Sequence, residues 1–299
     1  DEAKFPNSYK AWTPRLINEL GEEQDNIVVT PRGRGTSTWY VTQAHQDFFE
    51  VFADVHGLLN IDEDRRYLSG YSMGGYGTYL FGLMYPDLFA AGYSTSGAVT
   101  QGAWTGIGPD NPLCDMKEFE IPSQGLGNAC FIEANEGNSD AQLTYRILEN
   151  ALHFPITIHH GGNDELVPIT GIQVTALKLA LLGYRYDLHT FIGYEHYTQA
   201  IIDEWGDGAI YLNQFRRDPN PRKVVYKIVP ALVRATNTVR ANDVVFNFKP
   251  DGAYWARDLV VSDPEAEDPA VSGMIEAESL AIPAPRTLAL PTTADGAST

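Results

Sequence analysis

Gly70, Ser72 and Gly74 form the pattern G-x-S-x-G, which joins a predicted strand over residues 65–72 to a predicted helix over residues 74–86. In this setting a serine sits in a sharp, strained turn that projects its Oγ above a sheet. Side chains at the flanking positions would collide with the neighbouring strand and helix, which explains the glycines. The pattern predicts that Ser72 is a nucleophile for attack on an acyl carbon.

A serine hydroxyl is a weak nucleophile unless a base takes its proton, and the base needs an acid to orient it. In sheets of this kind the residues follow in the order serine, acid, histidine, each just past a strand end. Asp164 follows a predicted strand over residues 155–160, and His196 follows another over residues 184–193. We predict Asp164 as the acid and His196 as the base. Glu165 is the alternative acid, or a solvated loop carboxylate.

The chain has six other histidines, which we expect to be structural because they lie on predicted helices, within strands or at their ends. They are His45, His56, His153, His159, His160 and His189.

The oxyanion formed on attack needs backbone N–H donors, and the N–H of Met73 is the expected first donor. The second normally comes from a loop after an earlier strand, and no such strand precedes residue 11. His56-Gly57 and His160-Gly161 are unsuitably placed to replace it. We expect that the chain begins downstream of that strand, or that another element or chain supplies the donor.

Six aromatic residues near these positions are candidates for contacting an aromatic acyl group or a polyester chain, with ordinary core packing as the alternative. They are Trp39, Tyr40, Tyr71, Tyr76, Trp104 and Tyr197.

The composition excludes several classes of partner. With 21 Lys and Arg against 39 Asp and Glu, the net charge of -18 repels nucleic acids and anionic lipid surfaces. No apolar stretch approaches the roughly 18 to 20 residues of a membrane helix. Gly33-Arg34-Gly35 lacks the third glycine of a dinucleotide site, and no His, Cys and carboxylate cluster has metal-ligand spacing. We therefore expect no cofactor and no metal, apart from weak calcium binding as an alternative at the solvated acidic run 263–268.

Cys114 and Cys130 are the only cysteines, and their separation suits one local disulfide. Two unrelated buried thiols are the alternative. The first twelve residues contain no signal peptide. Low Lys content and the possible disulfide favour a secreted protein, whereas the sequence does not indicate the oligomeric state.

The pattern of apolar runs predicts two folded parts and a tail. Residues 1–220 alternate strands, one of them at 26–30, with amphipathic helices, which is typical of an α/β domain with a mostly parallel sheet. A long stretch at 98–137 is expected to be a cap or substrate loop. Residues 221–282, including runs at 223–229, 253–261 and 272–282, predict a small all-β, sandwich-like accessory domain. Residues 283–299 are expected to be a flexible tail.

Residues 67–97, together with GGNDELVP at 161–168 and GYEHY at 193–197, resemble the prolyl-oligopeptidase-like and esterase-D-like branch of the α/β-hydrolases. That branch also contains feruloyl esterases and polyhydroxyalkanoate depolymerases, and the resemblance covers about residues 11–215. It implies an α/β-hydrolase fold with nucleophile, acid and base at Ser72, Asp164 and His196. The C-terminal part is similar to β-rich domains that follow such hydrolases in large secreted bacterial proteins.

The leading functional hypothesis is therefore a serine hydrolase that cleaves small or polymeric carboxylic esters through an acyl-enzyme. A prolyl-oligopeptidase-like peptidase is the first alternative. A non-catalytic binding module with an incomplete oxyanion hole is the second.

Overall fold

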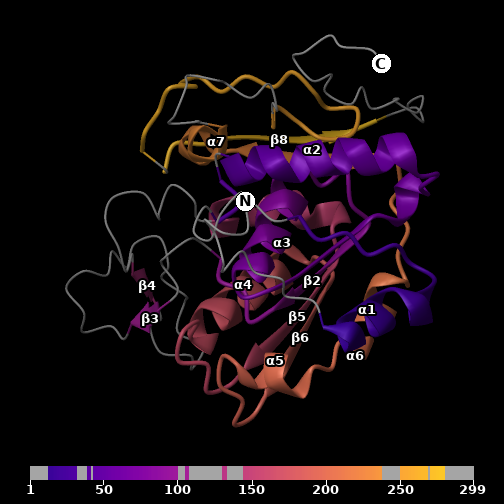
Figure 1. Cartoon of the computed structure of the whole chain (residues 1–299). Coiled ribbons are helices and arrows are strands. Elements are labelled where there is room, and N and C mark those ends of the chain that lie inside the picture. Colours follow the sequence, from indigo (N-terminus) through magenta and orange to yellow (C-terminus); the bar gives the residue numbers. More distant parts are fainter. Residues whose placement is uncertain are drawn as a thin grey trace.

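Four parallel strands form the central sheet, in the order β1-β2-β5-β6 (Figure 1). The strands are β1 (Tyr67–Tyr71), β2 (Ala91–Thr95), β5 (Ile156–Gly161) and β6 (Tyr186–Phe191). β2 and β5 are buried along their whole length, as expected of parallel strands covered on both faces. The computed structural model describes residues 13–31, 39–41, 43–99, 105–107, 130–132, 144–237, 250–268 and 270–279. The prediction of an α/β fold with a mostly parallel sheet is confirmed.

Helices cover both faces of this sheet (Figure 1). One layer contains α2 (Gln43–Leu58), α3 (Met73–Met84), η4 (Thr144–His153) and α4 (Ile169–Leu182), and its apolar side chains form the larger core cluster. The other face carries α1 (Pro14–Leu20) and α6 (Gly206–Leu212), which form a second cluster. No helix in the described ranges has both the length and the apolar composition that a bilayer span requires. The shorter helices are η1 (Glu22–Gln24), η2 (Glu63–Arg65) and α5 (Thr198–Ile202).

Helix ends follow local sequence signals. The Thr13 hydroxyl accepts a hydrogen bond from the Leu16 N–H at 3.1 Å, and Pro14 occupies the first turn of α1. α4 ends at Gly183, whose φ of 72° lies in the left-handed region that favours glycine. These signals fix the start of α1 and the end of α4.

The predicted strand at residues 26–30 is wrong, because this segment belongs to no sheet. Ile27 is 61% exposed, and Val28 and Val29 are also exposed. A buried strand needs a neighbour, and among the described strands β1 pairs only with β2. The stretch at 98–137 contains two short antiparallel strands, β3 (Thr105–Ile107) and β4 (Cys130–Ile132). Most of that stretch lies outside the described residues.

The C-terminal part is not all-β. It contains β7 (Lys223–Ile228) and β8 (Gly273–Glu278), which pair antiparallel, and also the helix α7 (Pro230–Asn237). Ala231 and Leu232 of α7 pack into the larger core cluster. The signal for this helix is Pro230 at its first position, where a missing N–H costs nothing. Residues 253–261, predicted as a strand, form only an isolated bridge between Ala253 and Ala256.

The C-terminal part also holds the end of α3. The Tyr226 hydroxyl donates to the carbonyl of Met84 at 2.7 Å, and the Tyr254 hydroxyl donates to that of Pro86 at 2.9 Å. The last carbonyls of a helix have no intrahelical donor, and Met84 is the last residue of α3, so the Tyr226 hydroxyl satisfies a group that burial would otherwise penalise. The Tyr254 hydroxyl binds the chain two residues past this end. The helix that begins beside Ser72 is thereby fixed at its far end.

Candidate active site

Ser72 lies in the turn between β1 and α3, with φ 55° and ψ -115°. Such a backbone conformation is unfavourable for a residue other than glycine and costs about 1 to 3 kcal/mol. The Ser72 N–H donates to the carbonyl of Thr95 on β2 at 2.8 Å, which ties the turn to the sheet. The structure therefore has the strained strand-to-helix turn that the G-x-S-x-G pattern predicts.

Close backbone approaches explain the glycines around this turn. A Cβ atom on Gly70 would lie 2.1 Å from the carbonyl carbon and oxygen of Gly74. A Cβ atom on Gly75 would lie 2.5 Å from the Cα of Gly97. Gly74 differs, because a Cβ there would meet no atom closer than 3.8 Å. Its main-chain atoms are the ones that a Cβ on Gly70 would overlap.

The structure brings the predicted nucleophile, base and acid together. His196 Nε2 lies 2.9 Å from Ser72 Oγ, and His196 Nδ1 lies 2.8 Å from Oδ2 and 3.0 Å from Oδ1 of Asp164. Asp164 is on the loop from β5 to α4, and His196 is on the loop from β6 to α5. Because a carboxylate only accepts, Nδ1 carries the proton and a neutral imidazole leaves Nε2 free to accept from the serine hydroxyl. The arrangement is chemically capable of activating Ser72.

Backbone donors hold the Asp164 carboxylate. Its Oδ1 accepts from the N–H groups of Leu166 at 3.0 Å and Val167 at 2.7 Å. Burial lowers the pKa of His160, so this ring is neutral at pH 7, and its Nε2–H donates to the carbonyl of Val167 at 2.6 Å. Val167 is therefore held at both its N–H and its carbonyl, which restrains the loop that carries Asp164.

Glu165, the alternative acid, does not reach the imidazole ring. Its Oε2 accepts instead from the backbone N–H of His196 at 3.1 Å. Asp164 is the carboxylate that contacts the ring.

Four of the other histidines form hydrogen bonds with groups other than Ser72. Burial lowers the pKa of His45 to about 4 and that of His159 to about 3. His45 Nδ1–H donates to the carbonyl of Tyr40 at 3.0 Å, and its Nε2 lies 2.9 Å from the Tyr85 hydroxyl. His56 binds the carbonyl of Phe52 through Nδ1, and His153 binds the carbonyl of Lys223 through Nε2.

Met73 is the first residue of α3. The first N–H groups of a helix have no intrahelical acceptor and carry its positive dipole end, so they favour a developing negative charge. The Tyr40 ring lies along the same helix, since a Cβ on Gly77 would lie 2.8 Å from the ring carbon Cδ2 of Tyr40. Its hydroxyl lies at the first turn of α3, 3.8 Å from the position of a Cβ on Gly74.

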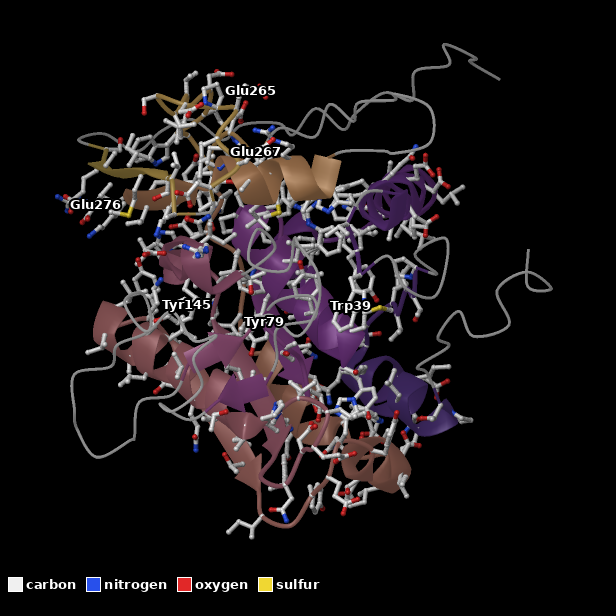
Figure 2. All side chains as sticks on the ribbon, turned by 90° about the vertical axis from the view of Figure 1, so that its left-hand side faces the viewer. Trp39, Tyr79, Tyr145, Glu265, Glu267 and Glu276 are labelled. Atoms are coloured by element: carbon white, nitrogen blue, oxygen red, sulfur yellow. The ribbon has the colours of Figure 1, made fainter. Side chains whose placement is uncertain are left out.

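The aromatic residues predicted to contact substrate lie in different surroundings. Trp39 packs edge-on against Tyr76 at 5.7 Å between ring centroids, and Figure 2 shows Trp39 beside the α3 ribbon. Tyr76, on the first turn of α3, faces the core and is completely buried. Its predicted role in substrate contact is therefore wrong. Tyr71 donates its hydroxyl to the carbonyl of His196 at 2.8 Å. Tyr197 is 58% exposed beside the base.

Several predictions fall outside the described residues. Trp104 and Cys114 are not described, and Cys130 is described only as part of the backbone of β4. The substrate contact and the disulfide therefore stay predictions. Within the described ranges, no three His, Cys, Asp or Glu residues are grouped so as to hold a metal ion.

The sequence matches a family model described as the prolyl oligopeptidase family over residues 19–205, more than half of the chain. No curated protein matches the chain. Similar solved structures include a thermostable esterase, with 20% identity over 58% of this chain and 37% of that one at a TM-score of 0.38. A putative dipeptidyl aminopeptidase IV from Bacteroides ovatus has 16% identity over 58% of this chain and 22% of that one, with a TM-score of 0.42.

An S-formylglutathione hydrolase from Staphylococcus aureus has 18% identity over 56% of this chain and 60% of that one, with a TM-score of 0.37. The matched region spans less than two thirds of each of these three proteins. Because the three TM-scores are below 0.5, no conclusion about activity follows from these likenesses.

Replacing Gly70 with alanine tests the close approach at the turn. We expect Gly70→Ala to lower the free energy of unfolding by about 3 kcal/mol or more, because the new methyl group would overlap backbone that cannot rotate away. Gly57→Ala on α2 is the matched control, since a Cβ there meets no atom within 4 Å. It should stabilise the protein by up to about 1 kcal/mol. Equal urea midpoints for the two variants would contradict the steric account.

Proposed function

Because the chain belongs to the prolyl oligopeptidase family, within the α/β-hydrolase superfamily of serine hydrolases, we propose that it hydrolyses carboxylic esters through an acyl-enzyme on Ser72. The observation that carries the proposal is the continuous hydrogen-bonded chain from Ser72 Oγ through His196 to Asp164. Nucleophile, base and acid are then Ser72, His196 and Asp164, in the roles that this geometry supports.

In the proposed reaction, Ser72 Oγ attacks the acyl carbon while His196 Nε2 takes its proton. The resulting imidazolium is stabilised by the Asp164 carboxylate, which remains ionised. The N–H of Met73 donates to the oxyanion. His196 then protonates the leaving alkoxide, and a water molecule activated by the same ring releases the acid from Ser72.

Exposed apolar side chains on the acid and base loops support an apolar substrate. Leu166 lies two residues after Asp164 and is 40% exposed, Ile192 is the first residue of the base loop and is 93% exposed, and Tyr197 adjoins the base. An aromatic ester or a polyester chain would cover such surface, and the net charge of -18 disfavours strongly anionic substrates. The family match is what favours the alternative, a peptidase.

Parallel assays with a p-nitrophenyl butyrate ester and a proline-containing peptide p-nitroanilide separate the two activities. We expect ester turnover by the purified chain with a higher kcat/KM than for the peptide. Ser72→Ala should lower ester turnover at least about a thousandfold, because the attacking group is lost.

Ser69→Ala is the matched control, since Ser69 lies three residues upstream on the exposed side of β1. Faster peptide turnover would replace the esterase proposal with the peptidase one. Equal ester turnover by wild type and Ser72→Ala would exclude Ser72 as the nucleophile.

We also propose that the Tyr40 hydroxyl is the second oxyanion donor. It lies at the first turn of α3, 3.8 Å from the position of a Cβ on Gly74. Burial raises the pKa of Tyr40, so the hydroxyl stays protonated and is able to donate. Trp39 and Tyr40 both have left-handed backbone, with φ 47° and 58°, a strain that is typical of functional positions.

Tyr40→Phe keeps the ring against α3 and removes only the donor. We expect kcat for the ester to fall on the order of a hundredfold, with KM within about twofold. Tyr67→Phe is the control, because the Tyr67 hydroxyl binds the carbonyl of Phe215 away from Ser72. A Tyr40→Phe enzyme with wild-type kcat would show that the second donor comes from elsewhere.

A further inference from the structure

The main chain of His196 is bound on both sides by side chains from other elements, the end of β1 and the loop after β5. Its N–H donates to Glu165 Oε2 at 3.1 Å, and its carbonyl accepts from the Tyr71 hydroxyl at 2.8 Å. Tyr71 is 125 residues away in sequence and Glu165 is 31 residues away. These are therefore tertiary contacts that join the end of β1 and the loops after β5 and β6.

Each of these partners is the sequence neighbour of a residue that contacts the imidazole ring. Tyr71 immediately precedes Ser72, and Glu165 immediately follows Asp164. Ser72 and Asp164 contact the two ring nitrogens of His196, while their neighbours bind its backbone. Side chain and main chain of the base are thus held by the same two turns.

Both partners have the chemistry that these contacts need. Burial raises the pKa of Tyr71, so its hydroxyl remains a donor toward the carbonyl. A carboxylate accepting from a backbone N–H makes a charge-assisted bond, which is stronger than a neutral one. The Tyr71 ring also packs against the imidazole, with 5.4 Å between centroids.

The base loop begins with two residues that make few contacts. Ile192 is 93% exposed, and Gly193 has a left-handed φ of 82° with no atom within 4 Å of the position of a Cβ. The next residue is tied to the acid loop, because the Asn163 N–H donates to the carbonyl of Tyr194 at 2.9 Å. A displacement of about 1 Å in such a loop is enough to reduce a reaction rate on the order of a hundredfold. The two contacts of the His196 main chain add a restraint at the residue that carries the imidazole.

We propose that Tyr71 and Glu165 are positioning residues, which hold the main chain of His196 so that Nε2 stays directed at Ser72 Oγ. Tyr71, predicted from the sequence to contact substrate, acts in this account through the base. Glu165 has a role distinct from both an alternative acid and a solvated loop carboxylate. The inference rests on the proposed function of Ser72 and His196.

Four variants test the proposal with ester turnover. We expect Tyr71→Phe and Glu165→Ala each to lower kcat about tenfold, the equivalent of one hydrogen bond, with KM within about twofold. Glu165→Gln should recover most of the loss, because its amide oxygen still accepts from the His196 N–H. Glu195→Ala is the matched control. It removes a carboxylate from the same loop, and this carboxylate is exposed and binds no described residue. The variant should keep wild-type kcat.

The number of active sites is measured in each variant by titration with a fluorophosphonate, and the rate of that labelling is a second readout. Wild-type kcat in both Tyr71→Phe and Glu165→Ala would overturn the proposal. A fall in kcat for Glu165→Gln equal to that for Glu165→Ala would also overturn it. The same holds if the lower kcat values are fully explained by a smaller number of titratable active sites. Should the wild-type chain hydrolyse no ester, the esterase proposal fails, and the labelling rates still decide the roles of Tyr71 and Glu165.

Discussion

The hydrogen bond between His196 Nδ1–H and the Asp164 carboxylate is the interaction on which the rest of the site depends. It decides which ring nitrogen carries the proton, and so it leaves Nε2 as an acceptor toward Ser72. The bond is buried, and the carboxylate is stabilised there by two backbone N–H groups of its own loop. Without that support, burying the charge of Asp164 would be costly.

The parallel sheet makes this bond possible between residues that are far apart in sequence. Because β1, β5 and β6 run in the same direction, the loops after them meet at one edge of the sheet, and each loop contributes one residue of the hydrogen-bonded chain. α3 starts at this edge and is held at its other end by hydroxyls from the C-terminal part. The C-terminal part therefore holds the far end of the helix whose first turn adjoins Ser72.

The parts of the site predicted from the sequence are those with local signals. The glycines beside Ser72 and the strand-then-loop settings of Asp164 and His196 are visible within short segments, and the structure brings these three residues together. Residues 26–30 are apolar enough for a strand, but strand formation also requires a paired neighbour, which a local pattern does not specify. The all-β prediction failed at α7 because a helix of eight residues leaves too short a periodic pattern. The contacts of Glu165 and Tyr71 with the His196 backbone had no signal in the sequence, since they arise only when segments far apart in the chain meet.

The central claim is that the Asp164–His196 pair activates Ser72. The most direct measurement is the rate at which a fluorophosphonate modifies the chain, with the adduct located by peptide mass spectrometry, in wild type and in Asp164→Asn. The account predicts a single adduct on Ser72 and a rate that falls by several orders of magnitude in the variant, because an amide favours the wrong tautomer of the histidine. An adduct on another residue, or equal rates in the two proteins, would contradict it.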